Sequence, residues 1–473
     1  MAGPSDGAAA AAAKAVAPFA LFAEARPTIA LAAPIAVALL AEMAMGVANT
    51  IMLGRLGPAA LAAGGLGAQL LFTPELIGIG VLSASGAVAA HGHGAGDRAA
   101  VAEAIRQGLR LALLLAILGV GVVIALPWLL GLMGEEPALV DGVAGYLRAG
   151  VFGLPLGLLF AALRNFLHAL GRPRVITLIM LGAVGLRVPL NQLFIHGGFG
   201  LPGRGVAGAG VASSLTYAAM LAALVLYIGL HPRYRAYGVL GHLGRARWTL
   251  FFEILHIGWP TGVVLAAEAG LFLVTSLLMG LLGPAVLAAH QIVQTTCAIT
   301  FMVPLAFGQA ATVRVGHALG GGQADRVRRV GFTAIGLGIA WMTLSAAGLM
   351  LLPRTIIGLY IDVADPANQA AVAVALLLLP IGALFQVFDG IQVVASGALR
   401  GLKDTRWPMA MALFGYWAMG LGSGSLLGFG LGFGAPGLWG GLAMGLAVVA
   451  LLLGWRFHRR SGQVRRGFAA AAA

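Results

Sequence analysis

The chain has 473 residues, of which 60% are hydrophobic and only 10% are charged, and its mean hydropathy is +0.95. Soluble globular proteins have about 25% charged residues, so this composition cannot cover a water-soluble surface. The apolar content also excludes a disordered chain, which leaves a polytopic membrane protein. The formal net charge of +13 is explained by cytoplasmic loops, which collect Lys and Arg, and we expect no nucleic-acid partner. The single Cys297 excludes an intramolecular disulfide.

Apolar stretches long enough to cross about 30 Å of hydrocarbon follow one another along the whole chain. In chain order they lie near 28–53, 59–87, 104–130, 139–163, 175–196, 206–230, 253–281, 286–313, 331–353, 368–398, 408–429 and 436–457. We therefore expect an all-α membrane protein of about twelve transmembrane helices, embedded in a lipid bilayer.

The connections between these spans alternate in charge. With the N-terminus inside, the cytoplasmic connections hold most of the cations, for example Arg164, Arg233 and Arg235, whereas Glu135 and Glu136 fall on the opposite side. The excess of Lys and Arg marks the cytoplasmic side of membrane proteins. The pattern predicts that both termini are cytoplasmic.

An internal repeat divides the chain into two halves. Residues of the first half recur 226 positions later, which chance does not readily produce as a series: Pro34 with Pro260, Glu42 with Glu268, Leu56-Gly57-Pro58 with Leu282-Gly283-Pro284, and His91 with His317. Six spans per half give both halves the same orientation, a transporter design with the site between the halves. We expect an N-lobe at 1–240, with a short cytoplasmic N-terminal tail, and a C-lobe at 241–473, with a basic cytoplasmic C-terminal tail.

Only a few ionisable residues fall deep inside the predicted spans. They are Glu42, Arg187, Glu268 and Asp389. A charge at the bilayer centre costs about 2.5–3.5 kcal/mol on insertion scales, so it normally faces a cavity or a partner. A structural ion pair and a functional role are both open for each carboxylate. For Arg187 we favour the ion pair, since a fixed cation would repel a cationic substrate.

The surroundings of Asp389 favour cation binding. Phe385 stands four residues before Asp389 and Gln392 three residues after it, so all three share one helix face. Carboxylates with amide oxygens suit Na⁺, and Glu268 and Asp389 would be its ligands if Na⁺ is coupled. Burial favours the protonated carboxyl and suits proton exchange. Residue types alone do not separate these two ions.

Two in-membrane amides are candidates for contact with a substrate. Asn49 stands seven residues after Glu42, on nearly the same helix face, and Asn191 follows Pro189. Taken singly, each is better explained by hydrogen bonding between helices. As a pair lining one cavity with Glu42 and Gln392, they become substrate candidates.

No enzyme motif occurs in the chain. It has neither a His-Glu-x-x-His zinc sequence nor a phosphate-binding Walker A sequence. We expect a protein that is not an enzyme and that needs no cofactor beyond a coupling ion, Na⁺ or H⁺.

Three stretches carry a family resemblance that runs from about residue 27 to 455. They are Phe301–Ala310 leading to Arg314-Val315-Gly316, the stretch Gly397–Arg406, and Pro189-Leu190-Asn191 together with Gly205–Gly208. On these residues the chain resembles the multidrug and toxic compound extrusion (MATE) transporters, in particular their bacterial NorM-like branch.

The resemblance implies a V-shaped protein of two six-helix lobes in the bacterial inner membrane. It would export organic cations and other xenobiotics in exchange for Na⁺ or H⁺, and we expect it to be a monomer. The family's C-lobe cation site matches Glu268, Asp389 and Phe385. Many relatives have an aspartate where this chain has Asn49, so an N-lobe protonation site would require Glu42 as a substitute.

The alternative is a lipid-linked precursor flippase of the same broad superfamily. A flippase is expected to have a strongly cationic cavity for pyrophosphate, and only Arg187 fits that expectation. An intramembrane enzyme would require a catalytic constellation that the sequence does not supply.

Overall fold

A computed structural model describes residues 18–198, 200–241 and 247–472. The N-terminal tail before residue 18 lies outside the described residues. The described chain is almost entirely helical, and the elements of its first half are α2 (Pro18–Gly54), α3 (Pro58–Gly94), α4 (Arg98–Leu132), α5 (Pro137–Gly150), α6 (Gly153–Ala169), α7 (Arg174–Asn191), η1 (Gln192–His196), β1 (Gly197–Gly198), β2 (Leu201–Pro202), α8 (Gly205–Leu230) and α9 (Pro232–Arg235).

The second half repeats this succession of long helices. Its elements are α10 (Trp248–Leu281), α11 (Pro284–Gly320), α12 (Ala324–Leu351), α13 (Pro353–Gly358), η2 (Pro366–Asn368), α14 (Gln369–Gly401), α15 (Arg406–Leu413), η3 (Phe414–Gly422), α16 (Ser423–Ser425), η4 (Leu426–Gly430) and α17 (Gly434–Ala472). The antiparallel pair β1–β2 is a two-stranded hairpin.

The number of predicted spans is confirmed. Eleven helices of the described chain are long and apolar enough to cross a membrane, and the bent pair α5 and α6 makes up to twelve. The helix axis bends by 46° between the two parts of this pair. The sequence predicted one continuous span at 139–163, but the helix is interrupted between Gly150 and Gly153. Residues 406–430 form one span that contains two π-helical segments, η3 and η4.

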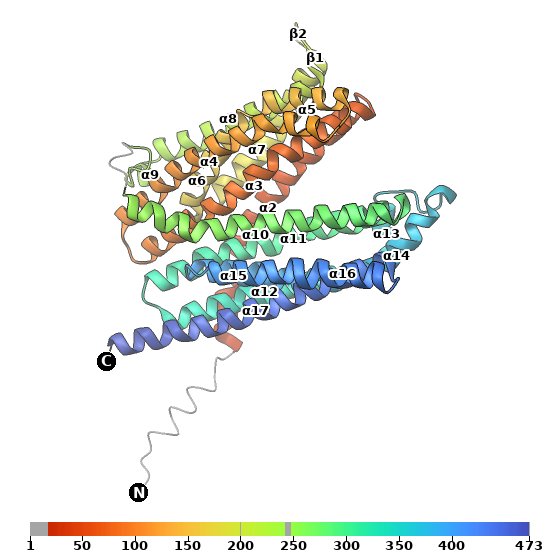
Figure 1. Ribbon diagram of the computed structural model, residues 1–473. Helices are drawn as coiled ribbons and strands as arrows, with labels where there is room; N and C mark the ends of the chain where they lie inside the picture. Colours follow the sequence, from red (N-terminus) through yellow and green to blue (C-terminus); the bar gives the residue numbers. More distant parts are fainter. Residues whose placement is uncertain (1–17, 199, 242–246, 473) are drawn as a thin grey trace.

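The helices form two bundles that diverge toward one end of the molecule. Figure 1 shows α4–α8 on one side and α11–α17 on the other, spread apart at the end that holds β1–β2 and α13. The bundles join through α2 and α3, which contact α11, and through α10, which contacts α3. This is the predicted V-shaped arrangement of two pseudo-symmetric six-helix lobes.

The sequence repeat has a counterpart in the backbone. Gly57 and Gly283, one repeat apart, both adopt positive φ angles of 111° and 117°, and each precedes a proline at the start of a helix. A side chain at these positions would be strained, because positive φ favours glycine. The two lobes therefore begin their second helix with the same tight turn.

The lobes meet closely near the ends of α3 and α11. A Cβ at Gly94 would lie 2.2 Å from the carbonyl oxygen of His317, and a Cβ at Gly320 would lie 2.0 Å from that of His91. These contacts are symmetric, since Gly320 and His317 are the repeat partners of Gly94 and His91. Backbones can pack at this distance only because both positions are glycine.

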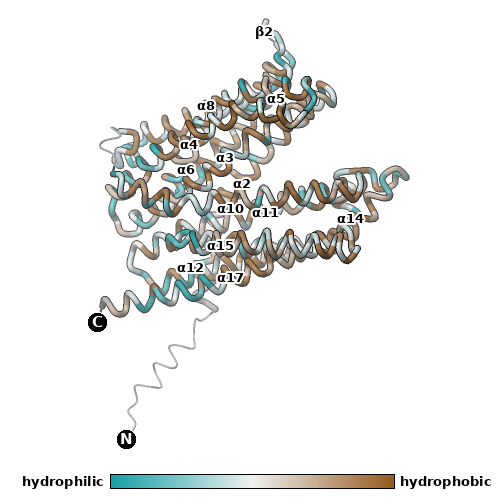
Figure 2. The backbone as a smooth tube through the Cα atoms, in the orientation of Figure 1, coloured by the Kyte–Doolittle hydropathy of each residue, from teal (hydrophilic) through white to brown (hydrophobic). Residues whose placement is uncertain are grey.

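The surface along the helices is apolar. Many large hydrophobic residues are exposed, among them Leu230, Leu281 and Leu351 at 77%, 77% and 78%. Figure 2 shows that hydrophilic segments gather near the end of the molecule where the C-terminus lies. An exposed apolar belt with polar ends fits lipid surroundings.

Candidate functional site

The two deep carboxylates of the C-lobe come from different helices of the same bundle. Glu268 lies on α10 and is partly exposed, and Asp389 lies on α14 and is 7% exposed. The two groups are near enough for their charges to interact. Two like charges that act on each other inside a membrane protein favour the uptake of a cation.

A chain of hydrogen bonds holds Asp389 in place. Gln392 Nε2 donates to Asp389 Oδ1 at 3.1 Å, and the Tyr416 hydroxyl donates to Gln392 Oε1 at 3.1 Å. Asp389 and Gln392 share a helix face, as the sequence spacing predicted, and both are buried. Tyr416, on the π-helical segment η3, was not foreseen. Tyr416 and Gln392 lie on different helical segments, 24 positions apart, so only the packing of these segments brings them together.

Phe385 lies one turn before Asp389 and is fully buried. Its ring packs edge-on against Trp439 at 5.4 Å and near Phe272 at 6.3 Å between centroids. The neighbouring Gln386 accepts a hydrogen bond from Thr300 at 2.9 Å. These ring and amide contacts connect α14 to α17 through Trp439, to α11 through Thr300 and to α10 through Phe272.

A metal ion at Glu268 and Asp389 would need further ligands from nearby side chains or backbone. Among residues 18–472 that the structure describes, no group of three or more His, Cys, Asp or Glu side chains is placed to hold a metal. A sodium ion at Glu268 and Asp389 would therefore depend on neutral oxygens as further ligands, which hard cations accept. The coupling role of Glu268, Asp389 and Phe385 stays a prediction.

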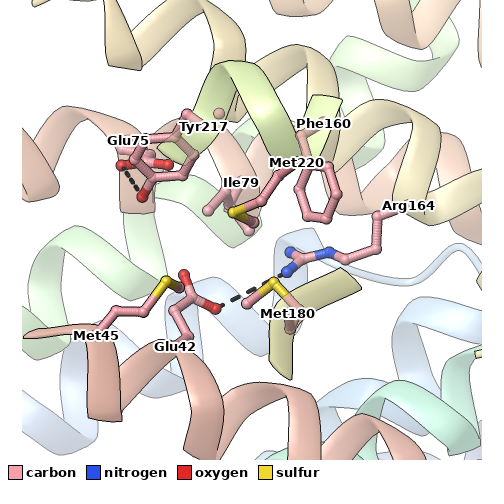
Figure 3. Close-up of a pocket in the computed structure, with 11 residues that line it drawn as sticks. Glu42, Met45, Glu75, Ile79, Phe160, Arg164, Met180, Tyr217 and Met220 are labelled. Carbon is pink, nitrogen blue, oxygen red and sulfur yellow. Dashed lines mark hydrogen bonds and ion pairs between the residues drawn. The ribbon is translucent and has the colours of Figure 1, made fainter. Parts of the chain in front are cut away.

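The N-lobe contains a second polar site inside its bundle, shown in Figure 3. Glu42 on α2 pairs with Arg164 on α6 at 3.9 Å, and the Tyr217 hydroxyl on α8 donates to Glu75 Oε2 on α3 at 3.0 Å. The cavity between them has a volume of about 10 Å³, room for about one water molecule. Its apolar lining includes three methionines, Met45, Met180 and Met220.

Sequence reasoning missed two of these charged groups. Glu75 is 4% exposed and lies inside the predicted span 59–87, where a carboxylate in apolar sequence is the signal that could have identified it. Arg164 was assigned to a cytoplasmic connection, but α6 continues to Ala169 and places the guanidinium in the cavity. The expectation that Arg164 is a loop cation is therefore wrong.

Asn49 and Asn191 are brought together, away from that cavity. Asn191 Nδ2 lies 3.5 Å from Asn49 Oδ1, and both residues are buried. Neither lines the cavity that holds Glu42. The contact matches hydrogen bonding between helices, and their role toward a substrate stays a prediction. Arg187 donates to Ser213, a neutral partner in place of the expected carboxylate.

Two helical lobes that span a membrane, with carboxylates inside each bundle, define a secondary transporter. The MatE family model matches residues 34–193 and 260–424, one stretch in each lobe. The chain belongs to this family of multidrug and toxic compound extrusion proteins, which are transporters and not enzymes.

Relatives match over nearly the whole chain. The multidrug resistance protein NorM of Burkholderia vietnamiensis is 44% identical over 453 residues, which are 95% of this chain and 97% of the relative. A probable multidrug resistance protein NorM of Pseudomonas aeruginosa is 41% identical over 442 residues, covering 93% and 90%. The protein is thus a multi-pass membrane protein of a bacterial multidrug-efflux family, and the flippase alternative is not favoured.

Solved structures share the fold. The eukaryotic MATE transporter AtDTX14 superposes with a TM-score of 0.82 at 19% identity, covering 95% of this chain and 100% of that one. An outward-facing multidrug resistance MATE transporter gives a TM-score of 0.84 at 19% identity, covering 93% and 96%.

Proposed function

We propose that this protein is a multidrug efflux antiporter that exports organic cations in exchange for Na⁺ or H⁺ bound at Glu268 and Asp389. The observation that carries the proposal is the interacting pair of carboxylates on α10 and α14, with Asp389 oriented by Gln392. The NorM relatives support the substrate class, since their names describe multidrug resistance proteins.

The exchange follows from charge. With both carboxylates ionised, the C-lobe attracts any cation. Uptake of one Na⁺ or H⁺ removes a negative charge and weakens the attraction of the C-lobe for an organic cation. The membrane potential adds about 2.3 kcal/mol per charge per 100 mV to the inward movement of the ion. The protein works as a monomer in the bacterial inner membrane, with both termini cytoplasmic, and needs no other cofactor.

Ethidium transport in inside-out membrane vesicles tests the proposal. Asp389→Asn and Glu268→Gln should each abolish accumulation driven by an imposed ion gradient. Glu253→Gln is a matched control, since Glu253 lies on the same helix α10 but pairs with Lys403 at an exposed position. Wild-type accumulation in Asp389→Asn, at equal protein level, would overturn the site.

Gradients of Na⁺ and pH imposed separately identify the coupling ion. The coupling ion is the one whose gradient drives ethidium accumulation in the wild type but not in Asp389→Asn. If the purified protein, reconstituted into lipid vesicles, translocated a lipid-linked precursor and not ethidium, the result would instead support the flippase function.

A further inference from the structure

The described end of α17 presents a stripe of basic residues around a hollow. Trp455, His458, Arg459, Gly462, Arg465 and Arg466 recur at three- and four-residue spacing, which places them on one face of the helix. Arg328 of α12 completes the lining, and its guanidinium lies 3.4 Å from His458 Nδ1. The hollow has a volume of about 420 Å³.

Gly462 leaves the middle of the stripe open. A Cβ at this position would meet no heavy atom within 4 Å. The long side chains of Arg459 and Arg466, one turn to either side, therefore border a space that nothing from the described chain fills. Arg459 also lies over the ring of Trp455, at 5.5 Å from its centroid.

The charge of this hollow is not balanced by acids. None of the seven described residues that line it is acidic. Neighbouring cations of the same region are neutralised: Asp404 pairs with Arg456 at 2.9 Å and with Arg460 at 3.1 Å, on the adjacent face of α17. In the described part of the chain no ion pair involves Arg459, Arg465 or Arg466. An overall excess of Lys and Arg would not by itself place the unpaired arginines on one face of α17 and the paired arginines on the adjacent face.

The position along the helix indicates where a ligand would come from. The apolar run of α17 ends near Leu453, and Trp455 follows, a residue that is 52% exposed. Tryptophan at the end of a span marks the level of lipid headgroups. The arginines thus begin where the phosphates of the bilayer lie, and basic pockets between helices at this level bind acidic headgroups.

We propose that the hollow between α12 and α17 is a binding site for the phosphate headgroup of an acidic phospholipid in the leaflet on the C-terminal side. The guanidinium groups would hold the phosphate oxygens by charge-assisted hydrogen bonds, and Trp455 would lie beside the glycerol region. The four arginines favour a headgroup with two phosphates, as in cardiolipin, over one with a single phosphate. The site is separate from Glu268 on α10 and Asp389 on α14.

Native mass spectrometry of the detergent-purified full chain tests the site with cardiolipin, phosphatidylglycerol and zwitterionic phosphatidylethanolamine. Each basic residue near an anionic surface contributes about fivefold to binding. The triple variant Arg459→Gln, Arg465→Gln, Arg466→Gln should therefore weaken cardiolipin binding by about a hundredfold. The triple variant Arg233→Gln, Arg235→Gln, Arg247→Gln removes the same charge at exposed positions elsewhere and should bind like the wild type.

A second pair of variants tests the hollow itself. Gly462→Glu places an acid in its centre and should abolish retention of cardiolipin, whereas Gly467→Glu, also free of contacts within 4 Å but outside the lining, should retain most of it. Equal losses in both triple variants, or no preference for acidic over zwitterionic lipid, would overturn the proposal. So would inorganic pyrophosphate that displaces cardiolipin at equal concentration, since the ligand would then be a soluble anion.

Discussion

Gln392 donates a hydrogen bond to Asp389 at 3.1 Å and accepts one from Tyr416 at 3.1 Å, so one amide links the candidate coupling acid to a helix of the same lobe. Hydrogen bonds to charged groups contribute about 1.5–3 kcal/mol. Gln392→Leu breaks both bonds and should reduce ion-driven ethidium transport about tenfold or more. Tyr416→Phe breaks only the second bond and should have a smaller effect.

Tyr360→Phe is the control for these variants, because the Tyr360 hydroxyl contacts Thr296 at an exposed position. It should transport at the wild-type rate. Transport by Gln392→Leu at the wild-type rate, with normal protein levels, would show that Asp389 does not depend on this amide.

The symmetric glycine contact between the lobes makes a prediction about conformation. A Cβ at Gly94 or Gly320 would meet a carbonyl oxygen of the other lobe at 2.2 Å or 2.0 Å. Overpacking of this kind costs about 1–3 kcal/mol, and the lobes can relieve it by separating at this end. We expect Gly94→Ala and Gly320→Ala each to increase the labelling of a cysteine introduced at this interface, in a background without Cys297.

Gly336→Ala and Gly348→Ala on α12 serve as controls, since a Cβ there meets nothing within 4 Å. Both should leave the labelling rate unchanged. An unchanged rate in Gly94→Ala and Gly320→Ala as well would mean that the close contact does not hold this end shut.

Local pattern was sufficient for the spans, except for the bend between α5 and α6, and it singled out two candidate acids. The positions of the helices followed from apolar length, and the repeat placed Gly57 and Gly283 in equivalent turns. Glu268 and Asp389 stood out because they are carboxylates in apolar surroundings. Glu75 carries the same local signal, a carboxylate inside the predicted span 59–87, and was overlooked; its partner Tyr217, which stands 142 positions later, has no such signal. Contacts at such separation depend on how the helices pack, and no local spacing encodes them.

The hydrogen bond between Tyr217 and Glu75 predicts a cost in stability. Glu75 is buried, and the Tyr217 hydroxyl is its donor at 3.0 Å. Removing one partner of a buried pair costs about 1–3 kcal/mol. Tyr217→Phe should lower the midpoint of thermal unfolding in detergent by several degrees, while the exposed Tyr360→Phe should not. Equal midpoints for both variants would contradict a structural role of this bond.

An ion pair across the lobes gives the last prediction. Glu24 at the start of α2 pairs with Arg314 of α11 and, at 3.1 Å, with Arg326 of α12. The side chains of Glu24 and Arg314 are 12% and 8% exposed. Breaking a buried pair by removing one partner costs about 3–5 kcal/mol, because the other charge stays buried and unpaired.

Glu24→Gln should therefore destabilise the contact between the lobes at the ends of α3 and α11 far more than Glu253→Gln does. In the control, the side chains of Glu253 and Lys403 are 44% and 30% exposed, and such a pair contributes about 0–1 kcal/mol. The measurement is the distance between spin labels placed on the ends of α3 and α11. We expect a population with a longer distance in Glu24→Gln and none in Glu253→Gln. Identical distance distributions in the two variants would show that the Glu24 pair does not join the lobes, and that the glycine contact between α3 and α11 is sufficient.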